Sequence, residues 1–296
     1  MKKLLLPALL STGMIASAAS AEEVTIKPGA LTLNAELSVA AGDITDGPMV
    51  LIQHGTLAHN KMEIIATLQE LLADEEINSL APNLSLGMDN RHGSYDCETD
   101  HVHKHEDAMT ELGQWVDWLK AQGVEQILIA GHSRGGGQVA AYTRNADTAI
   151  KGQFLIAPTD TTAETRAAGY EKRYSVPLVD KVAQAKALAS EAWMPENTSF
   201  IYCLRGGEVS AGSFLSYYDP QDEMNTVELL KGQSLPTTII AGSLDKVVPN
   251  LPAQVEAAAL DHVRFEVLED ADHYFRDLYA DEIIEYMLEQ LDEVMQ

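Results

Sequence analysis

The chain has 296 residues and carries 45 acidic against 20 basic side chains, which gives a formal net charge of −25 at pH 7. This acidic excess argues against nucleic acid or anionic lipid as the main partner, because both would be repelled. Hydrophobic residues make up 46% and charged residues 22%, a composition typical of a globular protein. The 2 cysteines exclude a disulfide-dense scaffold and a zinc site built from four thiolates.

Residues 1–21 have the order of a secretory signal peptide. Lys2 and Lys3 precede an apolar stretch, and small residues then end in Ala21, directly before two glutamates. About a dozen apolar residues are too few to cross a hydrocarbon core about 30 Å thick. We therefore expect cleavage after Ala21, with Ala18 the next candidate, and a periplasmic or secreted protein without a membrane span.

Strand and helix patterns alternate over most of the remaining length, which predicts an α/β fold with a mostly parallel central sheet flanked by helices. Continuous apolar runs such as Met49–Gln53 are typical of strands that are covered on both faces. In chain order, the expected strands are Val24–Ile26, Ala30–Val39, Met49–Gln53, Ile77–Ala81, Gln126–Ala130, Gly152–Ala157, Thr237–Ala241 and Arg264–Leu268. The expected helices are Met62–Ala73, Ala108–Leu119, Arg134–Thr143, Ala253–Leu260 and Ile283–Leu291.

The alternation stops between Thr159 and about Gly232, where prolines and glycines break short helical pieces. We interpret residues 159–232 as a mainly helical insertion over the sheet of a single domain, residues 22–296. The insertion is rich in aromatic residues, which either pack it onto the body or line an apolar pocket. These residues are Trp193, Phe200, Tyr202, Phe214, Tyr217 and Tyr218.

A candidate nucleophile lies between the expected strand Gln126–Ala130 and the helix that follows it. The run Gly131-His132-Ser133-Arg134-Gly135 matches the G-x-S-x-G pattern in the strand–turn–helix setting that a nucleophile elbow requires. The sharp turn crowds its neighbours, so the flanking positions must be glycine. We expect the Ser133 hydroxyl to project at the strand end, next to the positive pole of the helix.

A serine hydroxyl needs a base, and the base needs a carboxylate to orient it. Asp245 follows the strand Thr237–Ala241, and His273 follows the strand Arg264–Leu268. The chain order Ser, Asp, His is the order found in folds that use this elbow. Asp270 and Asp272 are rival carboxylates, which we interpret as solvated loop charges.

The turn Gln53-His54-Gly55-Thr56 ends the strand Met49–Gln53. We assign the oxyanion hole to the backbone N–H groups of Thr56 and Arg134, with Leu57 as a substitute for Thr56. His54 is interpreted as a packing residue and not as a proton carrier.

With these motifs, the sequence resembles the serine hydrolases of the α/β-hydrolase superfamily, esterases and lipases among them. The resemblance runs from about Met49 to His273, and residues 89–94 are similar to a shortened Asp-x-Arg-Gly-His-Gly-x-Ser stretch of that family. It implies an α/β-hydrolase fold with a cap insertion, acyl transfer to water, and no cofactor. A serine nucleophile argues against a dehalogenase or an epoxide hydrolase.

The sequence therefore predicts an exported serine hydrolase that cleaves small-molecule carboxylic esters through Ser133, Asp245 and His273. A peptidase or a thioesterase using the same three residues is the alternative, and a binding module without activity is a further one. The sequence leaves the natural substrate and the oligomeric state open.

Four histidines crowd the loop before the helix Ala108–Leu119, and their spacing matches no sharp metal motif. We expect a solvated or cap-contacting loop and no metal, although a metal-storing protein is a further alternative; these histidines are His92, His101, His103 and His105. Cys97 lies in this loop and Cys203 in the insertion, so the two thiols are either unpaired or joined by a disulfide that ties the insertion to the loop.

Overall fold

The computed structural model describes residues 21–219 and 224–295. Except for Ala21, the predicted signal peptide lies outside the described residues, and its removal stays a prediction. Within the described ranges, no helix is both long and apolar enough to cross a membrane.

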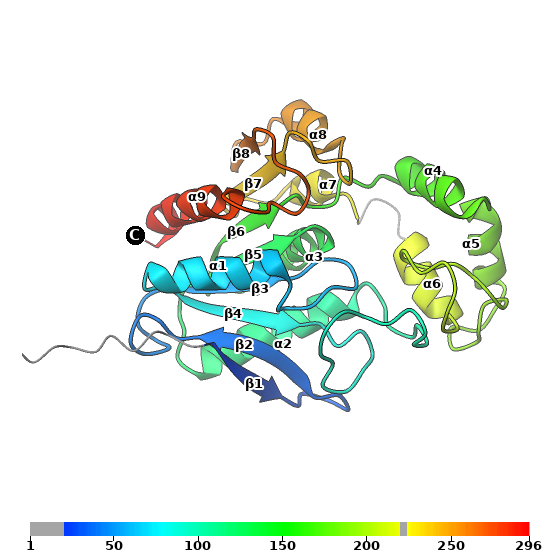
Figure 1. The fold of residues 1–296 in the computed structure, drawn as a ribbon, viewed down its shortest axis with the longest axis horizontal. Helices are drawn as coiled ribbons and strands as arrows, with labels where there is room; N and C mark the ends of the chain where they lie inside the picture. Colours follow the sequence, from blue (N-terminus) through cyan, green and yellow to red (C-terminus); the bar gives the residue numbers. More distant parts are fainter. Residues whose placement is uncertain (1–20, 220–223, 296) are drawn as a thin grey trace, which may run out of the picture.

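The centre of the molecule is an eight-stranded sheet in the order β1-β2-β4-β3-β5-β6-β7-β8 (Figure 1). β2 runs antiparallel to both of its neighbours, β1 and β4, and all other pairs are parallel. The predicted mostly parallel sheet is thus confirmed. The strands are β1 Glu22–Ile26, β2 Leu33–Ser38, β3 Met49–Gln53, β4 Asn78–Asn83, β5 Ile127–His132, β6 Ile150–Ile156, β7 Thr237–Gly242 and β8 Val263–Leu268.

Helices cover both faces of this sheet, with α1 and α9 side by side on one face and α2 and α3 on the other (Figure 1). The apolar stripe of α2 shows why the helix forms there, since Leu112, Trp115 and Leu119 recur at helical spacing and are fully buried. The helices of the body are α1 Glu63–Asp74, α2 Asp107–Ala121, α3 Arg134–Tyr142, α7 Thr226–Leu230, α8 Leu251–Ala258 and α9 Tyr279–Val294, with a short 3₁₀ helix at Thr143–Asn145.

The chain between β6 and β7 leaves the sheet and forms a group of three helices, which we call the cap (Figure 1). These are α4 Ala163–Tyr174, α5 Leu178–Lys186 and α6 Ala211–Tyr218. The cap has an apolar cluster of its own, centred on Phe200 and Phe214, separate from the core around the sheet. Helix α7 follows the cap in the chain but packs against α3 of the body.

The cap is joined covalently to the loop that precedes α2. Cys97 and Cys203 form a disulfide, so the hypothesis of a paired cap and loop is the one that the structure supports. Backbone hydrogen bonds extend the contact, because Gly207 N donates to Cys97 O at 2.7 Å. A Cβ atom at Gly206, where φ is +137°, would lie 1.8 Å from Cys97 O. Only glycine fits this close approach.

Removing the disulfide is expected to destabilise the protein, because the bond closes a loop of 106 residues in the unfolded chain. For the Cys97→Ser/Cys203→Ser double variant we expect the free energy of unfolding to fall by roughly 2–5 kcal/mol. Urea denaturation of the oxidised protein and of the variant measures the difference. Identical midpoints and slopes for the two proteins would contradict the expectation.

Candidate active site

Ser133 lies in a strained turn between β5 and α3. Its backbone has φ 56° and ψ −125°, a combination that residues other than glycine seldom adopt. The flanking glycines are required by close packing, since a Cβ atom at Gly135 would lie 2.4 Å from His54 O, and one at Gly131 would lie 2.6 Å from the Gly135 carbonyl. The loop after β3 is therefore pressed against the turn that carries Ser133.

The structure brings Ser133, His273 and Asp245 together in one hydrogen-bonded chain. The distance from His273 Nε2 to Ser133 Oγ is 2.9 Å, and the distance from His273 Nδ1 to Asp245 Oδ2 is 2.7 Å. Asp245 follows β7 and His273 follows β8, so the carboxyl ends of three parallel strands supply the three side chains. An ionised Asp245 only accepts, so Nδ1–H of His273 donates to it and Nε2 accepts from the Ser133 hydroxyl.

Asp245 is held as a carboxylate in spite of its burial. Burial opposes ionisation, but the hydrogen bond from His273 and those from two amides outweigh it and lower the pKa of the Asp245 carboxyl below its usual value. The amides are those of Val247 and Val248, which donate to Oδ1 at 2.7 and 3.1 Å. The rivals Asp270 and Asp272 are exposed, and within the described chain neither carboxylate is hydrogen-bonded to the His273 ring.

The residues expected to form the oxyanion hole lie on the two segments that meet at Ser133, the loop after β3 and the start of α3. Thr56 follows β3 and lines the cavity above Ser133, and Arg134 is the first residue of α3. Within the part of the chain that the structure describes, the backbone N–H groups of both residues have no hydrogen-bond acceptor. The Arg134 side chain donates from Nε to Thr56 Oγ1 at 3.0 Å and so links the two loops. Leu57 also lines the cavity.

His54 is a packing residue, as we interpreted it. Its ring is fully buried, and burial lowers its pKa to about 3. Nδ1–H donates to Gly55 O at 2.8 Å, while Nε2 accepts from Leu84 N at 3.1 Å. The ring therefore fixes the loop that carries Thr56.

Arg91 supports the loop after β3, a role that was not predicted from the sequence. Its buried guanidinium donates to Ala58 O at 2.9 Å and to Asn83 Oδ1 at 2.7 Å. These bonds join the loop after β3 to the end of β4. The family-like stretch at residues 89–94 was the signal that could have identified it.

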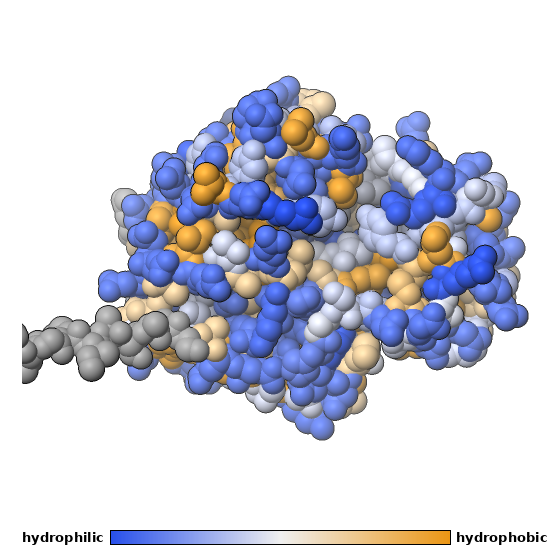
Figure 2. Space-filling view, in the orientation of Figure 1, coloured by the Kyte–Doolittle hydropathy of each residue, from blue (hydrophilic) through white to orange (hydrophobic). Residues whose placement is uncertain are grey.

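The cavity above Ser133 has a volume of about 460 Å³ and lies between the body and the cap. Figure 2 shows the surface hollowed between these two parts of the molecule. The cap contributes Arg173 and Tyr202, the loop after β7 contributes Lys246, and the loop after β8 contributes Tyr274. The side chains of three of the cap aromatics, Phe200, Phe214 and Tyr217, are instead buried in contacts that hold the cap together.

Three of the four loop histidines are buried beneath the cap, and only His92 is exposed. His103 Nδ1 lies 2.9 Å from the Tyr217 hydroxyl. The His101 ring lies 4.9 Å from the Phe200 ring and the His105 ring 5.6 Å from the Tyr217 ring, measured between centroids. They therefore contact the cap and are not solvated. Among the described residues, no group of three or more His, Cys, Asp or Glu side chains could hold a metal ion.

The buried histidines are expected to make the stability of the fold depend on pH. Burial lowers the pKa of His54, His103 and His105 to about 3 and that of His101 and His132 to about 4. Because each value lies below that of the unfolded chain, the unfolded state binds more protons as the pH falls below about 6.5. The contribution of these neutral, buried histidines to the free energy of unfolding is therefore complete above about pH 6.5. It is lost as the pH falls from there to 3–4, where the histidines of the folded protein become protonated.

We expect the free energy of unfolding to fall by several kcal/mol between about pH 6.5 and 5, since each group contributes up to about 1.4 kcal/mol per pH unit. Urea denaturation at a series of pH values measures this slope. His103→Gln should reduce this slope by the contribution of one histidine, because it removes a ring whose pKa burial lowers to about 3. A free energy that stays constant over this range would contradict the expectation.

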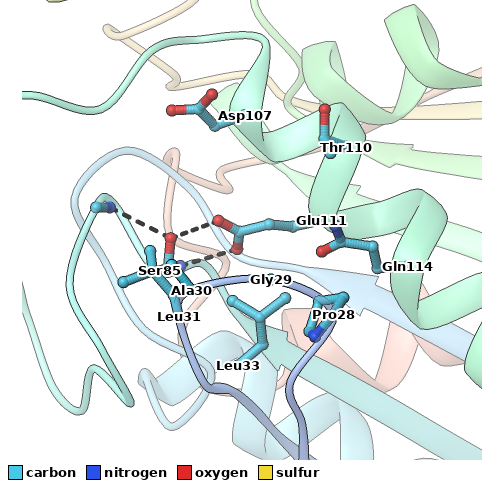
Figure 3. A pocket seen from close by; sticks show the side chains of 11 residues that line it. Pro28, Gly29, Ala30, Leu31, Leu33, Ser85, Asp107, Thr110, Glu111 and Gln114 are labelled. Carbon is cyan, nitrogen blue, oxygen red and sulfur yellow. Dashed lines mark hydrogen bonds between the residues drawn. The ribbon is translucent and has the colours of Figure 1, made fainter.

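A second cavity, of about 280 Å³, lies beside the β1–β2 hairpin and shares no lining residue with the first (Figure 3). Of the two carboxylates that line it, Asp107 and Glu111, the one of Glu111 on α2 is turned toward Ser85. It accepts from the Ser85 amide at 2.9 Å and from the Ser85 hydroxyl at 2.5 Å. Burial raises the pKa of Glu111, and the bonds from Ser85 oppose that rise. Glu111 thus fastens the loop after β4 to α2.

Comparisons with known proteins agree with this architecture. A family model described as "Alpha/beta hydrolase family" matches residues 49–285. No curated protein matches the sequence.

Several solved structures have the same fold. Est1E from Butyrivibrio proteoclasticus has 19% sequence identity and a TM-score of 0.66, over 91% of this chain and 99% of its own. The Pyrococcus furiosus esterase Pf2001 has 16% sequence identity and a TM-score of 0.60, and the match covers 94% of this chain and 92% of that protein. A putative lipase from Acinetobacter baumannii has 19% sequence identity and a TM-score of 0.62, and the match covers 93% of this chain and 92% of that protein. At these identities the likeness shows the fold alone.

Proposed function

The chain belongs to the alpha/beta hydrolase family, and from this premise we propose that it is an exported serine hydrolase that cleaves carboxylic esters. The observation that carries the proposal is the continuous hydrogen-bonded chain from Ser133 through His273 to Asp245, which opens on the cavity below the cap. This arrangement makes a hydroxyl nucleophilic next to a space that can hold a small ester.

In the first half of the reaction, Ser133 Oγ attacks the ester carbonyl carbon while His273 Nε2 takes the hydroxyl proton. The negative charge that develops on the carbonyl oxygen is stabilised by the N–H groups of Thr56 and Arg134, each worth about 3–4 kcal/mol in reactions of this type. His273 then gives its proton to the alkoxide, and the C–O bond to the alcohol breaks. Ser133 is left acylated.

In the second half, His273 takes a proton from a water molecule, which attacks the acyl carbon. The tetrahedral intermediate collapses, Ser133 recovers its proton from His273, and the carboxylic acid leaves. Asp245 remains ionised throughout. It stabilises the imidazolium that forms twice in each cycle.

Two observations favour an ester over an amide or a thioester, although the same residues could cleave all three. The structures that the fold matches include a protein named as an esterase and a putative lipase. Export, which the signal peptide predicts and the disulfide supports, would separate the protein from intracellular thioesters.

A panel of matched substrates tests the proposal. The purified protein is assayed with 4-nitrophenyl esters of graded acyl chain length, with the corresponding 4-nitroanilides, and with thioesters. We expect ester hydrolysis that His273→Gln removes and that the exposed His92→Gln variant retains. Faster cleavage of anilides or thioesters would transfer the proposal to the peptidase or thioesterase alternative.

A further inference from the structure

The cavity above Ser133 is lined by ionic side chains of one sign. Arg173 on α4 and Lys246 in the loop after β7 line it, and no aspartate or glutamate of the described chain does. The protein as a whole has 45 acidic and 20 basic residues, so the charge of the ionic side chains that line this cavity is opposite in sign to the net charge of the protein. The two cations come from different parts of the molecule, one from the cap and one from the body.

Neither cation is neutralised by a carboxylate within the described residues. Some other basic side chains are paired with a carboxylate, such as Lys61 with Glu36 at 2.7 Å and Lys120 with Asp147 at 2.5 Å. Arg276 lies over the Tyr274 ring, but its side chain is 3.8 Å from the carboxylate of Glu63, so it is not an unpaired cation.

Arg173 is held in place by an aromatic ring that also lines the cavity. Its guanidinium carbon lies 4.3 Å from the centroid of Tyr202. The backbone N–H of Tyr202 donates a hydrogen bond to the hydroxyl of Tyr174 on α4 at 3.0 Å, which fixes the Tyr202 backbone next to that helix. Stacking uses the face of the guanidinium and leaves the N–H groups at its edge available to a ligand.

We propose that the cavity binds esters that carry a carboxylate away from the scissile bond, and that Arg173 and Lys246 recognise this carboxylate. The inference rests on the proposed function and names its substrate class. A guanidinium can bind a carboxylate with two parallel hydrogen bonds, and the lysine ammonium adds a second positive charge. The net charge of the protein repels anions at long range, but this repulsion is screened beyond about 8 Å at physiological ionic strength.

A pair of nearly isosteric substrates tests the inference, the 4-nitrophenyl monoester of adipic acid and its neutral monoamide. For the wild type we expect a higher kcat/KM for the acid than for the amide, and a smaller difference at high salt. Arg173→Gln and Lys246→Gln should each reduce the acid-to-amide ratio by about three- to tenfold, and Arg173→Lys should restore part of it. Lys172→Gln is the matched control, because Lys172 is exposed on the same helix but does not line the cavity.

Binding measurements separate this inference from the proposed function. Calorimetry with the Ser133→Ala variant compares monomethyl adipate with its amide and needs no hydrolysis. Selective binding of the acid that Arg173→Gln removes supports the inference, even if no ester is cleaved. Equal binding and equal cleavage of acid and amide would overturn it, as would an equal loss of selectivity in Lys172→Gln. In that event the hydrolase proposal would still stand on the cleavage of neutral esters.

Discussion

Replacing Ser133 by alanine is expected to lower kcat for ester hydrolysis by about 10⁴- to 10⁶-fold. The variant lacks the oxygen that lies 2.9 Å from His273 Nε2 and that forms the acyl-enzyme in our account. Residual cleavage would come from binding and from the oxyanion hole alone. Steady-state assays with 4-nitrophenyl butyrate, corrected for the rate without protein, measure the loss.

The fold should survive this substitution, because alanine removes only the hydroxyl at the strained position. Far-UV circular dichroism and urea denaturation check that the variant is folded. Ser94→Ala is the matched control, since Ser94 is exposed and does not line the cavity. Equal rates for Ser133→Ala and Ser94→Ala would exclude Ser133 as the nucleophile.

For Asp245→Asn we expect kcat to fall on the order of 10⁴-fold while the fold stays intact. Oδ1 of Asp245 accepts from the amides of Val247 and Val248, so an asparagine oxygen would keep that place. The amide NH₂ group would then face His273 Nδ1, where a carboxylate oxygen now accepts at 2.7 Å. The ring would adopt the tautomer with the proton on Nε2, which cannot accept the proton of Ser133.

The rate constants of Asp245→Asn, measured at saturating substrate, test this argument. Asp270→Asn and Asp272→Asn are the controls, because both carboxylates are exposed near the same histidine. We expect these two variants to retain wild-type kcat within about twofold, as surface substitutions usually do. A loss in Asp272→Asn that matched the loss in Asp245→Asn would mean that the orienting carboxylate was assigned to the wrong residue.

The framework of the site could be predicted from the sequence because parallel strands deliver their carboxyl ends to one edge of a sheet. The expected strand Gln126–Ala130 corresponds to β5 Ile127–His132, and the glycines after it marked a turn that no larger residue fits. Ser133, Asp245 and His273 follow β5, β7 and β8, whose carboxyl ends lie at the same edge of the sheet. Their hydrogen bonds are a consequence of that topology.

The environment of the site could not be predicted in this way, because it depends on contacts between distant segments. Alternating histidines in a polar loop resemble a solvated surface, yet His103 is covered by Tyr217, which lies 114 residues later in the chain. The positions of Arg173 and Lys246 depend likewise on how the cap sits over the body. Periodicity and spacing carry no information on such contacts.

Labelling with a fluorophosphonate tests the central claim most directly, because the reagent phosphonylates an activated serine. After digestion of the labelled protein, mass spectrometry identifies the modified residue. Our account predicts one label on the peptide that contains Ser133, and no label in Ser133→Ala. A label on any other residue, or stoichiometric labelling that persists in the variant, would contradict it.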